Sequence, residues 1–314
     1  MVSVCNNPPC ATVRDVCILK ADMSYPYLSD VIKAWTGYEL PLPLATFGMF
    51  VALGALVAGA LFRAELKRLY EAGRIGPARV RGADVPPQDV VSDFMVVVMV
   101  AGVFGARLFH ILEHTDQFAS DPMGMIFTRS GLSIFGGLIL GTLAGMVCVR
   151  RWRLPVRPLL DAAAPAMMLG YAIGRIGCQV SGDGDWGIAA NMALKPDWLP
   201  AWFWAQTYDN NIYGELIALP GVYPTPMYET AMAALCFALL WALRKHAFGI
   251  GWLFSVYLML AGVERLLIEQ IRVNPVFNVA GLHATQAEII AVALIVLGAI
   301  NSLRLRLRLP VIVA

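Results

Sequence analysis

The fold is decided by the stretch Leu132-Ser-Ile-Phe-Gly-Gly-Leu-Ile-Leu-Gly-Thr-Leu-Ala-Gly-Met-Val-Cys-Val149, which runs directly into two arginines. It holds no charged side chain, and its length is close to the roughly 20 residues with which an α-helix crosses a bilayer. Gly137, Gly141 and Gly145 recur at every fourth position, so they share a helix face that a neighbouring helix can approach closely. The stretch predicts a transmembrane helix with a glycine seam and a basic end.

Stretches of similar length and hydrophobicity recur along the 314-residue chain, of which 58% is hydrophobic. That share exceeds the value of about 45 to 50% in soluble domains. A net charge of +2 is too small to suggest a nucleic-acid partner. We therefore expect an all-α polytopic membrane protein of about seven transmembrane helices. The expected spans lie near residues 43–62, 90–112, 132–149, 158–178, 224–243, 250–270 and 284–303.

Basic residues gather in alternate connections between these spans. Four such segments hold 15 of the 24 lysines and arginines, at 63–81, 150–157, 244–245 and 304–308. The positive-inside rule assigns these segments to the cytoplasm, so the N-terminus is expected outside and the C-terminus inside. The chain then divides into an outer N-terminal extension, a transmembrane domain with one long outer loop, and a cytoplasmic tail. These parts cover residues 1–42, 43–303 (with the loop at 179–223) and 304–314.

The six cysteines form no metal-binding pattern. Cys5, Cys10 and Cys17 lie in the N-terminal extension, and the chain has no Cys-x-x-Cys pair. Two of these three could pair in an oxidising compartment, and the sequence does not choose which. We expect neither a metal ion nor another cofactor.

One glycine-rich run imitates a nucleotide-binding motif. Residues 182–187 match the pattern G-x-G-x-x-G, but the run follows a membrane span where the motif requires a soluble strand. Its two carboxylates, Asp183 and Asp185, would also repel a pyrophosphate. We interpret the run as a turn that ends the fourth span.

Ionisable and polar residues of five different spans fall at one depth, near the outer helix ends. An arginine at the centre of a span costs about 2.5 to 3.5 kcal/mol on insertion scales, so such residues usually face a partner or a cavity. Taken singly, they also fit a simpler interpretation as interfacial arginines or as ion pairs that hold the bundle together. The residues are Arg107, His110, Arg175, Glu229, Arg265, Glu269, Arg272 and Gln286.

The arginines of this set suit an anionic ligand. Arg265, Glu269 and Arg272 are spaced by four and three residues, so they share one helix face and orient one another. Arg107 and Arg175 have no such acidic neighbour on their own helices. Guanidinium groups bind phosphate in a bidentate manner. Because the phosphate-bearing molecule at outer-leaflet depth is a phospholipid, we expect the site to bind one.

With these residues placed, the chain resembles the prolipoprotein diacylglyceryl transferase family of bacterial inner membranes, over residues of about 44 to 303. No single element is decisive, but their order, spacing and placement at outer helix ends are specific. The elements are Ser130-Gly-Leu-Ser-Ile-Phe-Gly-Gly137, Gly174-Arg175-Ile176-Gly177 with Trp186-Gly187, Tyr223-Pro-Thr-Pro-Met-Tyr-Glu229, and Glu264-Arg265-x-x-x-Glu269-x-x-Arg272.

The resemblance implies an enzyme that moves a diacylglyceryl group from phosphatidylglycerol to the lipobox cysteine thiol of a prolipoprotein signal peptide, releasing glycerol 1-phosphate. It implies a multi-pass protein of the bacterial inner membrane, expected as a monomer, so the extension 1–42 and the cap loop 179–223 would be periplasmic. By motif position, Arg265 and Glu269 lie at the reacting centre. The residues implied in substrate binding are Arg107, Gly136, Gly137, Arg175, Glu229 and Gln286.

Two departures from the family pattern concern proton transfer. Where the family has a histidine, this chain has Phe135 in the first element and Tyr223 in the third. A thiol with an ordinary pKa of about 8.5 must be activated as thiolate, and a carboxylate or a histidine elsewhere would have to assist. The candidates are Glu229, Glu269, His110 and His283.

The same departures leave a second function open. A relative that had lost its base could bind phospholipid in the membrane without transferring a group from it. The base and the thiol pocket separate these two hypotheses, because both share every arginine. A small-molecule transporter is disfavoured, since transport favours charges near the midplane and repeat symmetry, whereas here the charges crowd one end.

Overall fold

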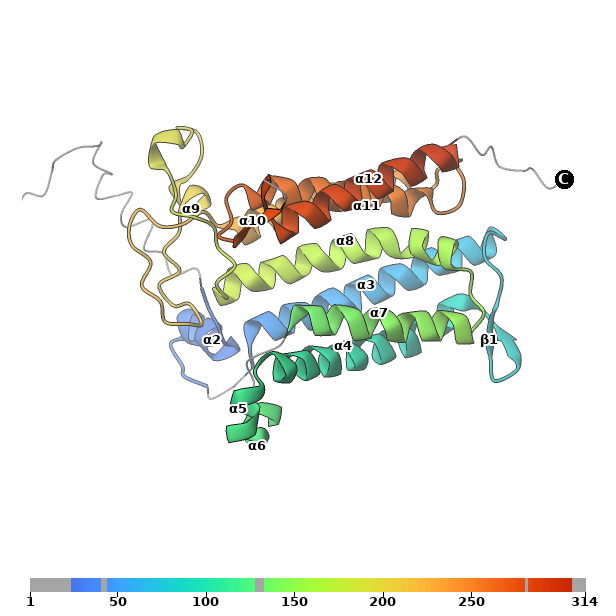
Figure 1. The fold of residues 1–314 in the computed structure, drawn as a ribbon, viewed down its shortest axis with the longest axis horizontal. Coiled ribbons are helices and arrows are strands. Elements are labelled where there is room, and N and C mark those ends of the chain that lie inside the picture. The colour runs from blue at the N-terminus through green and yellow to red at the C-terminus, as the bar shows by residue number, and fades with distance from the viewer. Residues whose placement is uncertain (1–23, 41–43, 128–132, 280–281, 307–314) are drawn as a thin grey trace, which may run out of the picture. The chain divides into compact units, whose positions relative to one another are not determined.

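The computed structural model describes residues 24–40, 44–127, 133–279 and 282–306. Helices dominate this part of the chain, and short two-stranded hairpins join some of them (Figure 1). The three N-terminal cysteines and the last eight residues lie outside the described residues. The elements are α2 (Leu28–Thr36), α3 (Thr46–Glu71), β1 (Ala78–Val80), β2 (Ala83–Val85), η1 (Pro87–Val90), α4 (Val91–Glu113), α5 (Thr115–Ser120), α6 (Pro122–Phe127), α7 (Ile134–Arg151), α8 (Val156–Ser181), η2 (Met192–Leu194), α9 (Ala201–Trp204), α10 (Thr225–Leu243), α11 (Trp252–Glu269), β3 (Val276–Val279), β4 (Leu282–Thr285) and α12 (Gln286–Arg306).

Among the described residues, five helices are long and apolar enough to cross a membrane: α3, α4 with η1, α7, α10 and α12. A helix suits this environment because it satisfies its backbone hydrogen bonds internally. The other two expected spans form α8, of 26 residues, and α11, of 18 residues. Within its 18 residues α11 carries Glu264, Arg265 and Glu269. These three charged side chains make α11 less apolar than the five helices named above. The total of seven membrane spans therefore stays a prediction.

The chain forms two compact units, and each is described by itself. Residues 58–166 make up the first, called here the central unit. Residues 1–57 and 167–314 make up the second, called the terminal unit. The residues that the sequence predicts near the outer helix ends are divided between the central unit and the terminal unit.

In the central unit, α4 and α7 pack side by side through glycines (Figure 1). A Cβ atom added to Gly136 would lie 2.2 Å from the carbonyl oxygen of Gly105, and one added to Gly105 would lie 2.3 Å from that of Gly136. Gly137, Gly141 and Gly145 also face α4, at 3.3 to 3.6 Å from its atoms by the same measure. The predicted glycine seam is confirmed, with Gly136 as its tightest point.

The other end of the central unit is held by a hydrophobic cluster. Phe62 and Leu66 of α3 pack there with Val149 at the end of α7 and Leu159 near the start of α8, and all four are buried. The β1–β2 hairpin adds Ala78, whose side chain is fully buried.

In the terminal unit, α11 packs against both α10 and α12. Glycines again permit the close approach, because a Cβ atom on Gly262 would lie 2.6 Å from the Ala291 carbonyl oxygen. A Cβ atom on Gly298 would lie equally close to that of Ser255. The antiparallel β3–β4 hairpin connects α11 to α12. This arrangement fixes the end of α11, where the charged residues lie.

The loop between α8 and α10 folds back on these helix ends. Isolated β-bridges join Gly187 to Arg272, and Val222 to both Ala189 and Gln206. Gly187 must be a glycine, because a Cβ atom there would lie 2.4 Å from the Ile271 carbonyl oxygen. The loop thereby brings the residues just after α8 beside the end of α11.

Candidate functional site

Three arginines and three carboxylates of the terminal unit form one ion-pair network. Arg175 lies near the end of α8, and Glu229 lies in the second turn of α10. Arg265 and Glu269 lie in the last two turns of α11, and Arg272 follows that helix. Asp185 comes from the loop after α8. The sequence predicted all of these residues except Asp185 to meet at one place, and the structure brings the five together.

Glu229 is the centre of the network. Its side chain is completely buried, with 0% exposed. One carboxylate oxygen pairs with Nη2 of Arg175, while the other lies 3.5 Å from Nη1 of Arg272 and 3.8 Å from Nη1 of Arg265. A buried carboxylate must be paired to be tolerated, and here three guanidiniums surround it. Glu229 therefore sets the positions of all three arginines.

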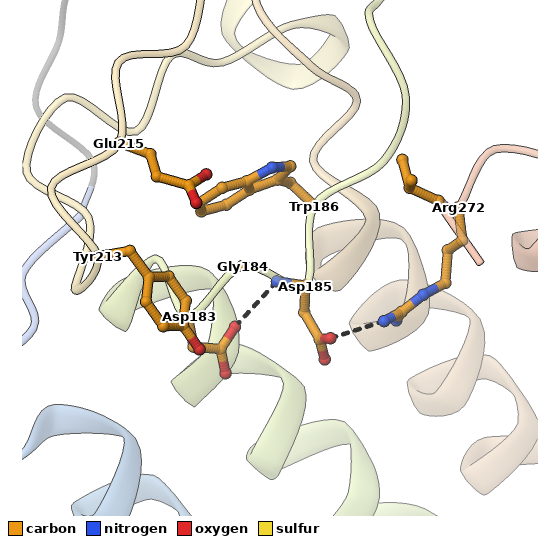
Figure 2. A pocket seen from close by; sticks show the side chains of 8 residues that line it. Asp183, Gly184, Asp185, Trp186, Tyr213, Glu215 and Arg272 are labelled. Atoms are coloured by element: carbon orange, nitrogen blue, oxygen red, sulfur yellow. Dashed lines mark hydrogen bonds and ion pairs between the residues drawn. The ribbon is translucent and has the colours of Figure 1, made fainter. Parts of the chain in front are cut away.

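Asp185 forms a second bridge between two of the arginines. It pairs with Nη1 of Arg175, and its Oδ1 lies 2.6 Å from Nη2 of Arg272 (Figure 2). The hydroxyl of Thr225 donates to its backbone carbonyl oxygen, which ties the loop to α10. Burial acts to raise the pKa of Asp185, but the Arg175 and Arg272 guanidiniums hold it below its ordinary value. Asp185 is thus a structural anion within the network.

The Arg265–Glu269 pair lies at the edge of the network. Nη2 of Arg265 is 2.7 Å from Oε2 of Glu269, one helical turn away, and Glu269 also accepts a hydrogen bond of 2.8 Å from Asn274. The Arg265 side chain is 31% exposed, against 11% for Arg175 and 14% for Arg272. Arg265 is therefore the most accessible guanidinium of the three.

The network is close to neutral, since three guanidiniums face three carboxylates. The sequence suggested a mainly cationic site, because Arg175 has no acidic neighbour on its own helix. The carboxylates that pair with it come from α10 and from the loop, and only the fold brings them near. An arginine has five N–H donors, so each guanidinium that holds a carboxylate still has donors for a second anion.

Two cavities flank the network. The first cavity, of about 530 Å³, is polar. It is lined by Asp183, Gly184, Asp185, Trp186, Tyr213, Glu215, Arg272 and Val273. Figure 2 shows Asp183 and Asp185 on one side of it, with Trp186 and Tyr213 nearby. The second, of about 310 Å³, is lined by Met168, Tyr171, Tyr257, Ala261, Glu264, Arg265, Ala287, Ile290 and Leu294.

The second cavity is mainly apolar, and its charged residues are Glu264 and Arg265. Glu264 is only 5% exposed, and its Oε1 accepts no hydrogen bond from the residues that the structure describes. Tyr171 links this cavity to the network, because the Arg175 guanidinium lies 5.8 Å from its ring centre. The sequence placed Glu264 at the start of a motif without assigning it a role. An acidic residue directly before Arg265, within an expected membrane span, was the available signal.

Three of the predicted binding residues lie in the central unit. Gly136 and Gly137 are part of the α4–α7 seam, where they have a packing role. Nη1 of Arg107, on α4, donates a hydrogen bond of 3.2 Å to the backbone oxygen of Met125. The predicted Gln286 is the first residue of α12 in the terminal unit and is exposed. The contribution of these four residues to substrate binding stays a prediction.

The structure gives Asp185 a role in the ion-pair network that the sequence did not predict. We interpreted its run as a turn, and the positive φ angles of Gly182 (60°) and Gly184 (88°) agree with that. The turn also aims the Asp185 carboxylate at two arginines, one of which is 87 positions away. A carboxylate ten positions after an arginine near the end of an expected span was a weak signal.

The two positions where histidine is expected carry no base. Phe135 is half-exposed on α7. Tyr223 is buried against Trp204, and its hydroxyl accepts a hydrogen bond of 3.1 Å from the backbone N–H of Asn191. Its role is to hold the loop.

Comparison with known proteins gives consistent matches. A family model described as prolipoprotein diacylglyceryl transferase matches residues 37–303. A relative from Leptospira interrogans (serovar copenhageni) is 29% identical over 277 residues, covering 79% of this chain and 77% of the relative. One from Corynebacterium glutamicum is 30% identical over 259 residues, covering 78% and 75%. One from Halalkalibacterium halodurans is 28% identical over 257 residues, covering 82% and 80%. Each is named phosphatidylglycerol–prolipoprotein diacylglyceryl transferase.

Proposed function

We propose that this chain, which belongs to the prolipoprotein diacylglyceryl transferase family, transfers a diacylglyceryl group from phosphatidylglycerol to the lipobox cysteine of a prolipoprotein. Curated relatives from several bacteria carry the name of that activity. The observation that carries the proposal is the network of Arg175, Glu229, Arg265, Glu269 and Arg272. All five occupy the motif positions of the family and meet beside two cavities.

The reaction forms one bond and breaks one. The cysteine sulfur attacks the glycerol carbon that carries the phosphate ester, and the carbon–oxygen bond breaks. Its electron pair stays on the departing oxygen, so glycerol 1-phosphate leaves with additional negative charge. Donors already in place around that oxygen stabilise the charge as it develops. The preorganised guanidiniums of the network suit this task.

Arg265 is the guanidinium that we assign to the phosphate of the bound lipid. It is the most exposed of the three, and it lines the apolar cavity in which hydrocarbon can be accommodated. Glu229 and Glu269 orient it from behind. Arg175 and Arg272 are more enclosed, and their remaining N–H groups add positive charge near the same phosphate.

The thiol proton needs an acceptor, and we assign that role to Glu264. Glu229 and Glu269, which the sequence also suggested, are each held by guanidiniums. Glu264 lies next to Arg265 in the chain, lines the same cavity and keeps an oxygen without a hydrogen bond. A general base must have a free lone pair within reach of the proton that it accepts. Glu229 and Glu269 are paired with guanidiniums, whereas no ion pair joins Glu264 to an arginine among the described residues.

The location follows from the same assignment. We propose a multi-pass protein of the bacterial inner membrane with seven spans, in which α8 and α11 join the five apolar helices. The network then lies at the periplasmic ends of its helices, together with the cap loop 179–223. We also propose that the chain acts as a monomer.

A direct experiment tests the activity. The purified protein is placed in phosphatidylglycerol vesicles with a lipobox peptide, and mass spectrometry follows the diacylglyceryl adduct and glycerol phosphate. We expect both products in equal amounts, and none from a peptide whose cysteine is replaced by serine. Arg63→Ala is the matched control, since Arg63 forms an exposed ion pair with Asp89 outside the network. A folded, membrane-inserted protein that binds the lipid without forming adduct would contradict the transferase and favour a lipid-binding relative.

A further inference from the structure

Three side chains at the end of α4 have the chemistry of metal ligands. His110 and Glu113 lie three residues apart in the last turn of α4, and His114 is the residue that directly follows this helix. One ligand atom from each lies within 4.8 Å of the other two. The two imidazole rings are 4.5 Å apart between centres. None of the three belongs to the ion-pair network.

The ring of His114 is oriented with a nitrogen left for a ligand. Its Nδ1 lies 3.1 Å from the backbone carbonyl oxygen of His110. A carbonyl oxygen only accepts hydrogen bonds, so Nδ1 carries the proton and the neutral ring keeps its lone pair on Nε2. Metal-binding histidines are held in this way, because a hydrogen bond from one ring nitrogen fixes the tautomer of the other.

The carboxylate of Glu113 is also held in place. It accepts a hydrogen bond of 2.8 Å from the hydroxyl of Ser133, a buried residue that directly precedes α7. That hydroxyl makes no capping hydrogen bond to α7. Outer hydrogen bonds of this kind orient the first ligands of a metal site. Ser133 thus connects the three side chains at the end of α4 to the start of α7.

We propose that His110, Glu113 and His114 bind a divalent transition-metal ion, with zinc as the first candidate. Two imidazoles and one carboxylate, with a fourth position for water, are a ligand set that zinc uses. Ligands at about 2.1 Å from tetrahedral zinc lie about 3.4 Å apart, so the three side chains close by at most about 1.4 Å through their torsion angles. The bound ion would fasten the end of α4 to the start of α7. This inference does not depend on the proposed transferase activity.

A second group of ligand types in the structure is less suitable. Cys178, Asp183 and Asp185 also lie within 4.8 Å of one another. However, Asp185 is held by the guanidiniums of Arg175 and Arg272, which would repel a cation. The sequence argued against zinc on the cysteine pattern alone, and a site of histidines and a carboxylate lies outside that argument.

Metal binding by the full chain in detergent tests the proposal. The protein is stripped with a chelator, dialysed and titrated with ZnCl₂ by calorimetry, and with CoCl₂ by visible absorption, which reports tetrahedral geometry and thiolate ligation. We expect one equivalent to bind. The double variant His110→Asn, His114→Asn should lose at least 100-fold in affinity. Ser133→Ala should lose about tenfold, as expected for an outer hydrogen bond.

Two controls locate the bound ion. His283→Asn removes a histidine elsewhere, and its affinity should equal that of the wild type. A variant with Cys5, Cys10 and Cys17 changed to serine should also bind as the wild type does. Zinc should raise the thermal midpoint of the wild type and leave that of the double histidine variant unchanged. Binding that survives the double histidine variant, or that disappears with the three cysteines, would overturn the proposal, as would the absence of saturable binding.

Discussion

Arg175 joins two carboxylates that its own helix does not supply. Its guanidinium pairs with Asp185 through Nη1 and with Glu229 through Nη2. Lysine carries the same charge as a single point and lacks the planar fork that holds two partners at once. We therefore expect Arg175→Lys and Arg175→Ala to lower turnover by at least about 100-fold, as for the loss of a preorganised donor. Lipid transfer to the lipobox peptide measures this.

The same substitution should also affect stability, and a second variant separates the two effects. Removing one partner of a buried ion pair costs about 3 to 5 kcal/mol, and Arg175→Ala leaves three carboxylates facing two guanidiniums. Glu229→Gln, added to Arg175→Ala, restores the balance of charges in the network and should restore part of the lost thermal midpoint without restoring turnover. If turnover recovered together with the midpoint, Arg175 would have only a structural role.

Glu264, unlike Arg175, is buried beside an apolar cavity without a hydrogen bond to its Oε1. A polar group left in this state costs about 1 to 3 kcal/mol. We expect Glu264→Leu, which has a similar volume, to raise the thermal midpoint while lowering turnover by at least about 100-fold. Scanning fluorimetry and the adduct assay measure the two quantities.

Glu264→Gln is the matched control for shape. It keeps the size of the side chain and removes only the ability to accept a proton. Turnover as low as in the leucine variant would agree with a proton acceptor. Full activity of Glu264→Gln would exclude that role and return the choice to Glu229, Glu269 or a histidine.

At the scale of the elements, α4 and α7 depend on a glycine contact that tolerates no side chain. A Cβ atom on Gly136 would meet the Gly105 carbonyl at 2.2 Å and the Cβ atom of Phe109 at 2.5 Å. Such overpacking costs about 1 to 3 kcal/mol, so we expect Gly136→Ala to lower the thermal midpoint. Gly48→Ala in α3 should not, because nothing lies within 4 Å of its added Cβ atom. Equal midpoints for the two variants would contradict the seam.

The sequence predicts where the long helices lie better than it predicts the residues at which they end. Hydrophobicity placed a helix at each of the seven expected stretches, but α3 continues to Glu71, well beyond the expected end at residue 62. The continuation is amphipathic, and Leu66 and Leu69 bury themselves in the central unit. A search for uniformly apolar residues stops where charged residues begin. The expected stop therefore marks the end of the apolar stretch, while the helix itself runs on.

The site could be predicted for residues that lie on helices and not for those that a loop delivers. Arg265 and Glu269 are one turn apart, so their pairing follows from helical spacing alone. Asp185 reaches Arg272 only because the loop folds back through the Gly187–Arg272 bridge. Of the two partners of Arg175, Asp185 was missed for the same reason, whereas Glu229 lies on α10 and was expected at the site. Contacts between distant parts of the chain depend on packing that one sequence does not show.

At the scale of the whole molecule, the acidic loop residues connect the stability of the protein to pH. Asp183 and Asp185 lie two positions apart in the loop after α8, yet they are affected in opposite directions. Burial and the neighbouring Asp185 charge raise the pKa of Asp183 above its ordinary 3.8. The two guanidiniums, acting against burial, lower that of Asp185. The pair therefore provides a matched comparison within one loop.

The sign of each effect follows from linkage. A carboxyl whose pKa is lower in the folded state stabilises the protein above its unfolded pKa, and that contribution is lost as pH falls through the folded pKa. Asp185→Asn should accordingly lower the thermal midpoint at pH 7. The difference from the wild type should begin to shrink as pH falls below about 3.8, the ordinary value of an aspartate, and should disappear once pH is below the lowered pKa of folded Asp185.

Asp183→Asn should have the reverse effect. Its carboxylate is penalised in the folded state, so the substitution should raise the midpoint at pH 7. As pH falls through the raised pKa of Asp183 towards 3.8, the wild type takes up a proton, regains stability and approaches the variant. The asparagine can still accept the hydrogen bond from the Asp185 backbone N–H, so the turn keeps its shape. Midpoints that shift in the same direction for both variants at pH 7 would contradict the opposite environments of the two carboxylates.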